Sequence, residues 1–381
     1  ECQLIKYMNK LNFPTHFQDN LHSFIESLQK EDENFLYFPT NIGLTQDGKN
    51  LSLGFSTYVL KLFYMTGLWD DLSKPVRDKW IENINSYQKN HQNLPINSYI
   101  DQTLLNFYKK PPISKKIKNS IKKQLSFLST VNYYSLDVQL LNAIRAETKQ
   151  AISTIHQVGY KNTKPYLEFP KSESEIISFL ESFDWSKPWD AGANFSSICV
   201  FSNTQLPANE YQNNKEVLYK FTSKIVDKET GSYFIGKTPS ETELINGAMK
   251  VITGMDWLNV PIHEPEKLID YCLGVVPKNE GCDIVDLVYV LFKCSEQTNY
   301  KKNEIILYMI DIYKLIFDHY FKDYGGFSYY LNKSQMYYSG LIISEGKSTP
   351  DIHGTLLLCW AISMIDKISE SNNLGWNIIK P

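Results

Sequence analysis

Two aspartates stand at the start of an apolar segment in the C-terminal half of the chain. Asp283 and Asp286 are three residues apart, and residues 287–292 after them are all apolar. Side chains three residues apart lie on one face of a helix. Two carboxyl groups so near to one another can hold a proton at neutral pH or share a metal ion. We predict that Asp283 or Asp286 is a catalytic acid. The alternative is that both only stabilise the N-terminus of a helix.

A second polar set, made of Lys347, Asp351 and His353, precedes the last apolar run. Pro350 followed by Asp351 is typical of a helix start, which places His353 in the first helical turn. A histidine there usually has a structural role, yet this set is denser than a helix cap requires. We predict that Asp351 and His353 take part in acid or base catalysis and that Lys347 binds substrate.

Further polar and aromatic residues near the starts of apolar segments are weaker candidates. Asn246 and Lys250 share a helix face, as Arg145 and Lys149 do. The tryptophans near residue 187 either wall a pocket or pack in the core. The predicted substrate-binding residues are Trp185, Trp189, Asp190, Asn246, Lys250, Tyr329 and Lys347.

A weak internal repeat indicates how these residues are positioned. In residues 227–234, 277–284 and 322–329 a charged turn leads to Gly and then to an aromatic residue or Cys, before another apolar run. The turns start about 45 to 50 residues apart, which is enough for two antiparallel helices. Such pairs must stack or close into a ring to bury their apolar faces. In a ring, polar groups at the N-termini of the inner helices converge at one mouth of the cavity.

Helical patterns dominate the remaining sequence. Residues 53–65 are apolar on most faces, as expected of an inner helix, whereas residues 76–88 are apolar on one face, as expected of an outer helix. Further helices are predicted at residues 136–155, 175–183, 243–255, 284–292, 305–320 and 355–368. Only residues 329–343 are compatible with a short hairpin.

These patterns predict an all-α fold, an (α/α) barrel or toroid of about six helix pairs in which inner and outer helices alternate. A single domain is expected to cover residues 1–381, with residues 1–50 forming lead-in helices. An open solenoid and two stacked helical bundles are the alternatives.

Composition and charge argue against several functions. The net charge of −3 gives no overall field that would attract nucleic acid. The seven lysines in residues 109–123 are predicted to form a solvated loop and helix face. No apolar run reaches the roughly 18 residues that span a bilayer, so no integral membrane segment is predicted. Six dispersed cysteines are typical of reduced thiols in a cytoplasmic protein. Motifs of serine hydrolases, zincins, P-loop NTPases and Rossmann enzymes are absent.

At the residues described above, the chain resembles the α/α toroid superfamily that includes class II terpene cyclases and the β subunits of protein prenyltransferases. Residues 346–355 resemble the prenyltransferase stretch Gly-Lys-x-x-Asp-x-Tyr-His-Thr, and Glu280-Gly-Cys282 resembles its Asp-Gly-Cys. Because these stretches supply zinc ligands in that family, the resemblance implies zinc at Glu280, Cys282 and His353.

The cyclase part of the resemblance rests on the aspartate pair. Asp283 and Asp286 are similar to two of the three acids of an Asp-x-Asp-Asp motif, whose middle Asp protonates an alkene. In the prenyltransferase match, aligning Asp351 and Thr355 places the histidine ligand at Gly354, one residue after His353. We predict no cofactor, with zinc or magnesium as the alternative.

The leading functional hypothesis is a toroid enzyme that applies acid or acid/base chemistry to an isoprenoid in a central cavity lined by aromatic residues, which make up 14% of the chain. The partner is then a small-molecule substrate, and a protein partner is not predicted. One alternative is a carbohydrate-active (α/α) barrel enzyme, a glycosidase, lyase or epimerase. Another is a non-catalytic toroid that binds a partner.

Overall fold

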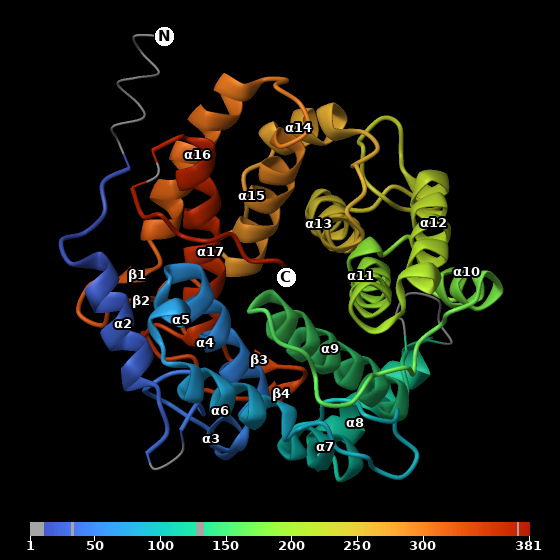
Figure 1. Cartoon of the computed structure of the whole chain (residues 1–381), viewed down its shortest axis with the longest axis horizontal. Coiled ribbons are helices and arrows are strands. Elements are labelled where there is room, and N and C mark those ends of the chain that lie inside the picture. Colours follow the sequence, from blue (N-terminus) through green and yellow to red (C-terminus); the bar gives the residue numbers. More distant parts are fainter. Residues whose placement is uncertain (1–10, 32–33, 127–132, 372) are drawn as a thin grey trace.

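The computed structural model describes residues 11–31, 34–126, 133–371 and 373–381 (Figure 1). The fold is all-α, as predicted. Its helices are α2 Phe17–Ser27, α3 Gln46–Asn50, α4 Leu53–Thr66, α5 Leu68–Asp71, α6 Lys74–Asn85, α7 Gln102–Lys109, α8 Ile113–Ser126, α9 Leu136–Gln157, α10 Glu173–Glu181, α11 Pro188–Gln205, α12 Ala208–Ile225, α13 Glu241–Leu258, α14 Pro265–Leu273, α15 Gly281–Ser295, α16 Lys302–Phe317 and α17 Ile352–Ile368. The strands are β1 Tyr320–Phe321, β2 Gly326–Phe327, β3 Tyr337–Tyr338 and β4 Leu341–Ile342.

Six helices, α4, α9, α11, α13, α15 and α17, contact one another in that order, and α17 contacts α4. We call them the inner helices, and the region that they surround in Figure 1 the interior. On their outer sides, α6 packs on α4, α7 on α9, α12 on α11, α14 on α15 and α16 on α17. The predicted helices at 53–65 and 76–88 correspond to α4 and α6, with boundaries that differ by three residues or fewer.

The inner helices are apolar on most faces because they are covered on both sides. In α4, Phe55, Val59, Leu60 and Leu62 have no accessible surface. Burial of a side chain of this size stabilises a fold by about 1.5 to 3 kcal/mol. This double coverage explains why the sequence of α4 lacks the one-sided pattern of α6.

Helices α11 and α13 approach one another especially closely, and small residues make this possible. A Cβ atom at Gly247 would lie 2.5 Å from the Cβ atom of Pro188, and one at Gly254 would lie 2.6 Å from the ring of Phe195. Both distances are shorter than van der Waals contact. The glycines of α13 therefore set its distance from α11 and bring Lys250 of α13 close to the start of α11.

The three repeated turns all precede an inner helix, namely α13, α15 or α17. Strands β3 and β4 pair within residues 329–343, where the sequence allowed a hairpin. A second hairpin, β1 with β2, was not predicted. Its strands are two residues long, too short for an alternating pattern, and its turn at Gly325, with φ of 82°, packs on Asn20 of α2.

The last residues of the chain cross the interior at the C-terminal ends of the inner helices (Figure 1). Asn377 donates its backbone N–H to the carbonyl oxygen of Met65 in α4 at 2.8 Å. On the opposite side, the Trp257 indole of α13 donates to the carbonyl oxygen of Pro381 at 3.0 Å. Lys380 donates to the carbonyl oxygen of Asp256 at 3.0 Å. The segment thus covers this end of the interior.

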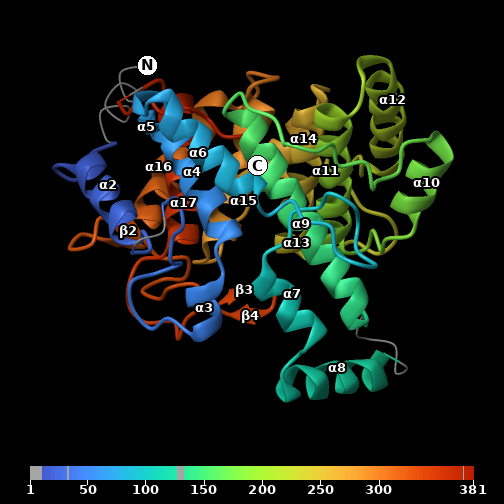
Figure 2. The same cartoon turned by 60° about the horizontal axis from the view of Figure 1, so that its bottom comes forward.

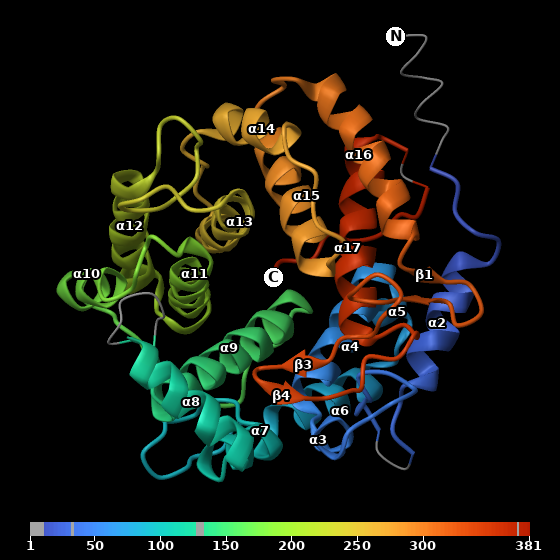
Figure 3. The same ribbon diagram turned by 180° about the vertical axis from the view of Figure 1, so that it is seen from behind.

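The opposite end, where the inner helices begin, faces the viewer in Figure 3, together with the β3–β4 hairpin, α7 and α8. No helix in the described part of the chain combines the length and apolar character needed to cross a membrane. Five of the six cysteines lie in that part and all are free thiols: Cys199, Cys272, Cys282, Cys294 and Cys359.

Candidate functional site

Several side chains of the inner helices are enclosed by protein and still keep accessible surface. They are Tyr58 of α4, Lys149 of α9, Cys282 of α15 and His353 of α17. Both properties together are expected of side chains that border space inside a protein. These four residues come from four of the helices that surround the interior.

Asp286 is the most unusual carboxyl group of this region. It is 2% exposed, and its Oδ2 atom has no hydrogen-bond partner. Burial raises its pKa to about 7, while Lys250 opposes and Asp283 adds to this rise. Asp283 itself, one turn earlier, accepts a hydrogen bond from the Asn246 amide at 2.9 Å. Near neutral pH a substantial fraction of Asp286 is therefore protonated, which is the form that a general acid needs.

His353 lies between two tyrosine rings. Its ring stacks on Tyr58 with centroids 4.9 Å apart and on Tyr329 with centroids 5.3 Å apart. The Nδ1 atom has no hydrogen-bond partner. Burial, and then Lys250, lower its pKa to about 3, so the imidazole is neutral. A neutral imidazole held between two rings can orient a substrate by donating or accepting a hydrogen bond.

Asp351, predicted to be catalytic, is instead engaged as a helix cap and loop anchor. It accepts hydrogen bonds from the backbone N–H groups of Gly354 at 2.8 Å, Tyr329 at 2.7 Å and Gln335 at 3.0 Å. These bonds engage both carboxylate oxygens of a side chain that is 1% exposed, and they fix the loop that carries Tyr329. Asp351 therefore positions the Tyr329 ring over His353.

Three lysines from three inner helices approach one another in the interior. Lys61 of α4 is 3% exposed and donates to the carbonyl oxygen of Lys380 at 3.3 Å. Burial, and then repulsion by Lys61 and Lys250, lower the pKa of Lys149 well below its usual value. Burial lowers the pKa of Lys61 to about 7. Within the described residues, none of the three forms an ion pair with a carboxylate. Buried amines without a counter-ion favour binding of an anion.

A further buried carboxyl group, Glu147 of α9, was not predicted. It is 2% exposed and accepts hydrogen bonds from the Tyr338 hydroxyl at 3.2 Å and from the backbone of Asp101 at 3.3 Å. Burial, and then repulsion by Asp101, raise its pKa to about 8. Asp101 in turn accepts the N–H groups of Ser52 and Leu53 at the start of α4. Glu147 lies between Arg145 and Lys149, in sequence typical of an exposed helix.

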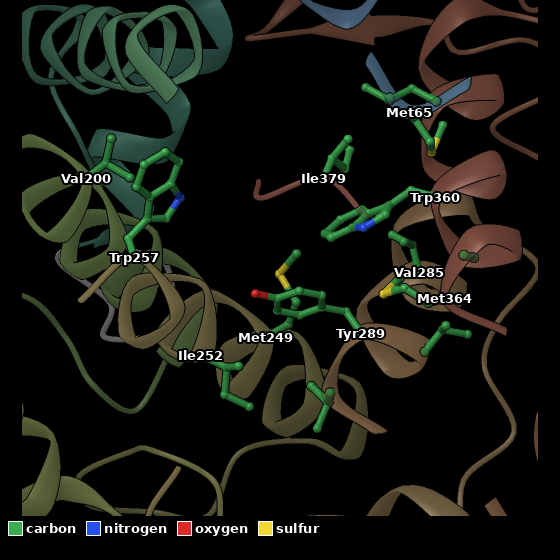
Figure 4. Packing of buried hydrophobic residues seen from close by; sticks show 14 of the residues in the cluster. Met65, Val200, Met249, Ile252, Trp257, Val285, Tyr289, Trp360, Met364 and Ile379 are labelled. Carbon is green, nitrogen blue, oxygen red and sulfur yellow. The ribbon is translucent and has the colours of Figure 1, made fainter. Parts of the chain in front are cut away.

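Toward the C-terminal ends of the inner helices the interior becomes apolar and aromatic. Figure 4 shows Trp257, Tyr289 and Trp360 on three helices that border one region, with Ile379 of the C-terminal segment above Tyr289 and Trp360. The rings of Tyr289 and Trp360 lie 5.0 Å apart. Tyr289 follows Asp286 by three residues on the same helix, so the apolar region begins one turn beyond the acid.

Two predicted substrate-binding residues lie at the edge of this site. Trp189, 46% exposed, has the Lys250 ammonium 5.9 Å from its ring centre. Asp190 accepts a hydrogen bond from Tyr134 at 3.2 Å.

Two other predicted substrate-binding residues, Trp185 and Lys347, lie outside this site. Trp185 is in the core, where its ring packs on Phe221 and its N–H bonds to Leu180. Lys347 forms a surface ion pair with Glu345 at 3.0 Å.

The residues implied as zinc ligands are not arranged as a ligand set. In the described part of the chain, no three His, Cys, Asp or Glu side chains converge as a metal ion requires. Cys282 and His353 both border the interior, but the His353 ring is held flat between Tyr58 and Tyr329. Glu280 precedes the first residue of α15, where its side chain forms no cap. The arrangement does not fit a Glu280, Cys282 and His353 site.

Comparisons of the chain with models of protein families, with curated proteins and with solved structures gave no match. The resemblance to terpene cyclases and prenyltransferases therefore stays a prediction from the sequence. The chemistry of the interior is the basis for the function argued below.

Proposed function

We propose that the chain is an (α/α) toroid enzyme that protonates an isoprenoid substrate in its interior, in the manner of a terpene cyclase. The cyclic order of contacts among the inner helices, and the outer helix on most of them, support the toroid assignment. The observation that carries the function is Asp286, a buried carboxyl group with a pKa near 7 and a free Oδ2, one turn from an aromatic region.

The proposed reaction starts with Asp286. Its O–H bond breaks, and the proton forms a C–H bond at one carbon of a substrate alkene, leaving a carbocation and an aspartate. Lys250 stabilises that aspartate, since it already lowers the pKa of Asp286. Loss of a proton from a neighbouring carbon to a carboxylate, Asp283 or Asp286, then restores an alkene.

The aromatic region supplies the second requirement, stabilisation of the cation. The faces of Tyr289, Trp360 and Trp257 attract a positive charge through their quadrupoles, by about 0.5 to 2 kcal/mol for each ring. Their apolar surfaces also exclude water, which would otherwise trap the cation as an alcohol. Asp286 would protonate the substrate, and the aromatic region one turn further along α15 would stabilise the cation while it cyclises.

The lysines favour an isoprenoid that carries an anionic group. Lys61 and Lys149 form no ion pair within the described residues and burial lowers the pKa of both, so a phosphate or diphosphate would restore their protonated state in the interior. With a diphosphate as leaving group, the same arrangement would serve a prenyltransferase-like reaction. An isoprenoid diphosphate is therefore our first choice of substrate.

The two alternative functions are supported less well. Sugar-binding enzymes place aromatic faces along a polar groove, but Trp185 lies in the core and Trp189 only at the edge. A non-catalytic toroid would engage its polar groups in structural hydrogen bonds. Asp351 does so, whereas Asp286 and His353 each keep an unpartnered atom.

The test is turnover of a panel of isoprenoid diphosphates and neutral polyenes, followed by mass spectrometry of the products. We expect Asp286→Asn to lower the rate by about 10² to 10⁴, the range for loss of a general acid. Asp311→Asn is the matched control, because Asp311 is exposed on α16. Equal product from the Asp286 variant would rule out this acid. Turnover of sugars but of no isoprenoid would favour the carbohydrate alternative.

A further inference from the structure

Helix α8 carries an apolar stripe that points into solvent. Its members are Ile113, Ile117, Ile121 and Leu125, exposed by 75%, 54%, 49% and 42%. They are spaced four residues apart and so follow one side of the helix. Exposed apolar side chains are common singly, but four in a row on one helix form a surface that needs a partner.

The opposite side of α8 holds it on the protein. The Lys115 ammonium lies 4.7 Å from the ring centre of Phe107 and 4.5 Å from that of Tyr108. Asn119 accepts a hydrogen bond from Gln139 of α9 at 3.0 Å. Since Lys115 and Asn119 lie on the polar face, the stripe is directed away from the rest of the molecule. Figure 2 shows α8 projecting from the body on the side of α3 and the β3–β4 hairpin.

Lysines border the stripe, and the sequence around them contains no acidic residue. At about 100° per residue, Lys118 lies about 80° to one side of the centre of the stripe, and Lys116 about 120° to the other. No Asp or Glu occurs between Asp101 and Asp137, a segment with seven lysines. A helix with an apolar stripe bordered by lysines is typical of segments that lie in the surface of a membrane.

We propose that α8 docks on an anionic membrane surface, with its stripe in the acyl region and its lysines at the headgroups. The charge decides between a membrane and a second copy of the chain. Two copies of α8 meeting through their stripes would bring positive charges together, whereas anionic headgroups attract them. The net charge of −3 does not oppose this, because at physiological salt screening weakens the repulsion between the headgroups and acidic residues more than about 8 Å away.

Docking in this orientation turns a particular face of the protein toward the lipid. The β3–β4 hairpin lies on the same side as α8 (Figures 2 and 3) and exposes Tyr337 and Ile342 by 50% and 51%. The inner helices begin on this side as well, so His353 and Asp283 lie toward the membrane end. This inference rests on α8 alone and holds whatever reaction the interior supports.

The experiment is co-sedimentation of the full chain with phosphatidylcholine vesicles that contain or lack phosphatidylserine. We expect binding to the phosphatidylserine vesicles that weakens as salt is raised. In the double variant Ile117→Glu/Ile121→Glu, binding should be at least about tenfold weaker, because two side chains lose their burial in lipid. Both residues are exposed, so circular dichroism and the melting temperature should match those of the parent.

The matched control is Leu307→Glu, an apolar residue 40% exposed in the first half of the outer helix α16, at the end opposite to the starts of the inner helices, which should bind vesicles like the parent. Equal binding by the parent to vesicles with and without phosphatidylserine would contradict the charge argument. Equal binding by the double variant and the parent would contradict the role of the stripe. A parent dimer that the double variant converts to a monomer would assign the stripe to a second copy and overturn the proposal.

Discussion

The two ends of the interior differ in what their side chains do for the protein. Toward the end where the inner helices begin, Asp286 and His353 are enclosed and ionisable, and each has a side-chain atom without a hydrogen-bond partner. At the other end, Trp257, Tyr289 and Trp360 point into the interior, and the C-terminal segment covers it. Buried ionisable groups without partners destabilise a fold, whereas buried rings stabilise it.

This difference indicates a division of labour along one helix. In α15, Asp286 and Tyr289 are three residues apart, yet the first destabilises the folded state when ionised and the second contributes packing. Functional groups are commonly retained at a cost in stability that packing elsewhere offsets. The three predictions that follow test whether the two ends really separate in this way.

The largest effect is expected in the aromatic end. Trp360→Ala removes a ring that is 2% exposed and packs on Tyr289, so the free energy of unfolding should fall by about 3 to 5 kcal/mol. Urea unfolding followed by circular dichroism measures this. The control in the polar end is Lys149→Met, which removes a buried amine and should not lower stability. A similar loss in both variants would abolish the contrast between the two ends.

A smaller effect is expected for the pH dependence of stability. The pKa of Glu147 is about 8, above that of a glutamate in the unfolded chain, so the folded protein binds its proton more tightly. The stability that follows is complete below the unfolded pKa of 4.5 and is lost as pH rises through about 8. Glu147→Gln, which cannot ionise, should remove a few kcal/mol of this decrease.

Urea unfolding at several pH values between these limits checks the prediction. Asp286, with a pKa of about 7, contributes in the same direction and remains in the variant, so the decrease should shrink without vanishing. If the free energy of unfolding changed with pH by the same amount in the parent and in Glu147→Gln, Glu147 would not be held in its neutral form.

The smallest effect is expected at Asp351, which anchors the loop that carries Tyr329. Asp351→Ala removes the acceptor of three backbone N–H groups and should cost about 1 to 3 kcal/mol of stability. It should also loosen the Tyr329 ring over His353 and lower turnover less than Asp286→Asn does. If Asp351→Ala abolished turnover in a stably folded protein, Asp351 would be a reacting group and not a positioning residue.

The sequence predicted much of this architecture because helix patterns are local. The apolar sequence of α4 and the start of α17 at Pro350-Asp351 were predicted. Asp351 does cap α17. The pair Asp283 and Asp286 was also found, since their position before an apolar run is visible in one segment. Lys250 was named because it shares a helix face with Asn246.

Other members of the site depend on packing between distant segments. Glu147, Lys61 and Tyr58 resemble ordinary helix residues, and their burial comes from contacts among α4, α9 and the hairpin. Trp185 looked like a pocket wall, but its direction is set by contact with α12. The stripe of α8 was overlooked because its lysines suggested a solvated face. Four isoleucine and leucine side chains attract notice only once their exposure is known.

The contact between α17 and α4 has a consequence for synthesis of the chain. Thr40 donates a hydrogen bond to the carbonyl oxygen of Pro350, 310 residues later, and α4 borders α17. When α4 leaves the ribosome its final neighbour has not been translated, and at about 5 to 20 residues per second the delay is about 15 to 60 s. Throughout that time the apolar flank of α4 that α17 will cover needs a temporary cover, so a chaperone is expected to bind the nascent chain there.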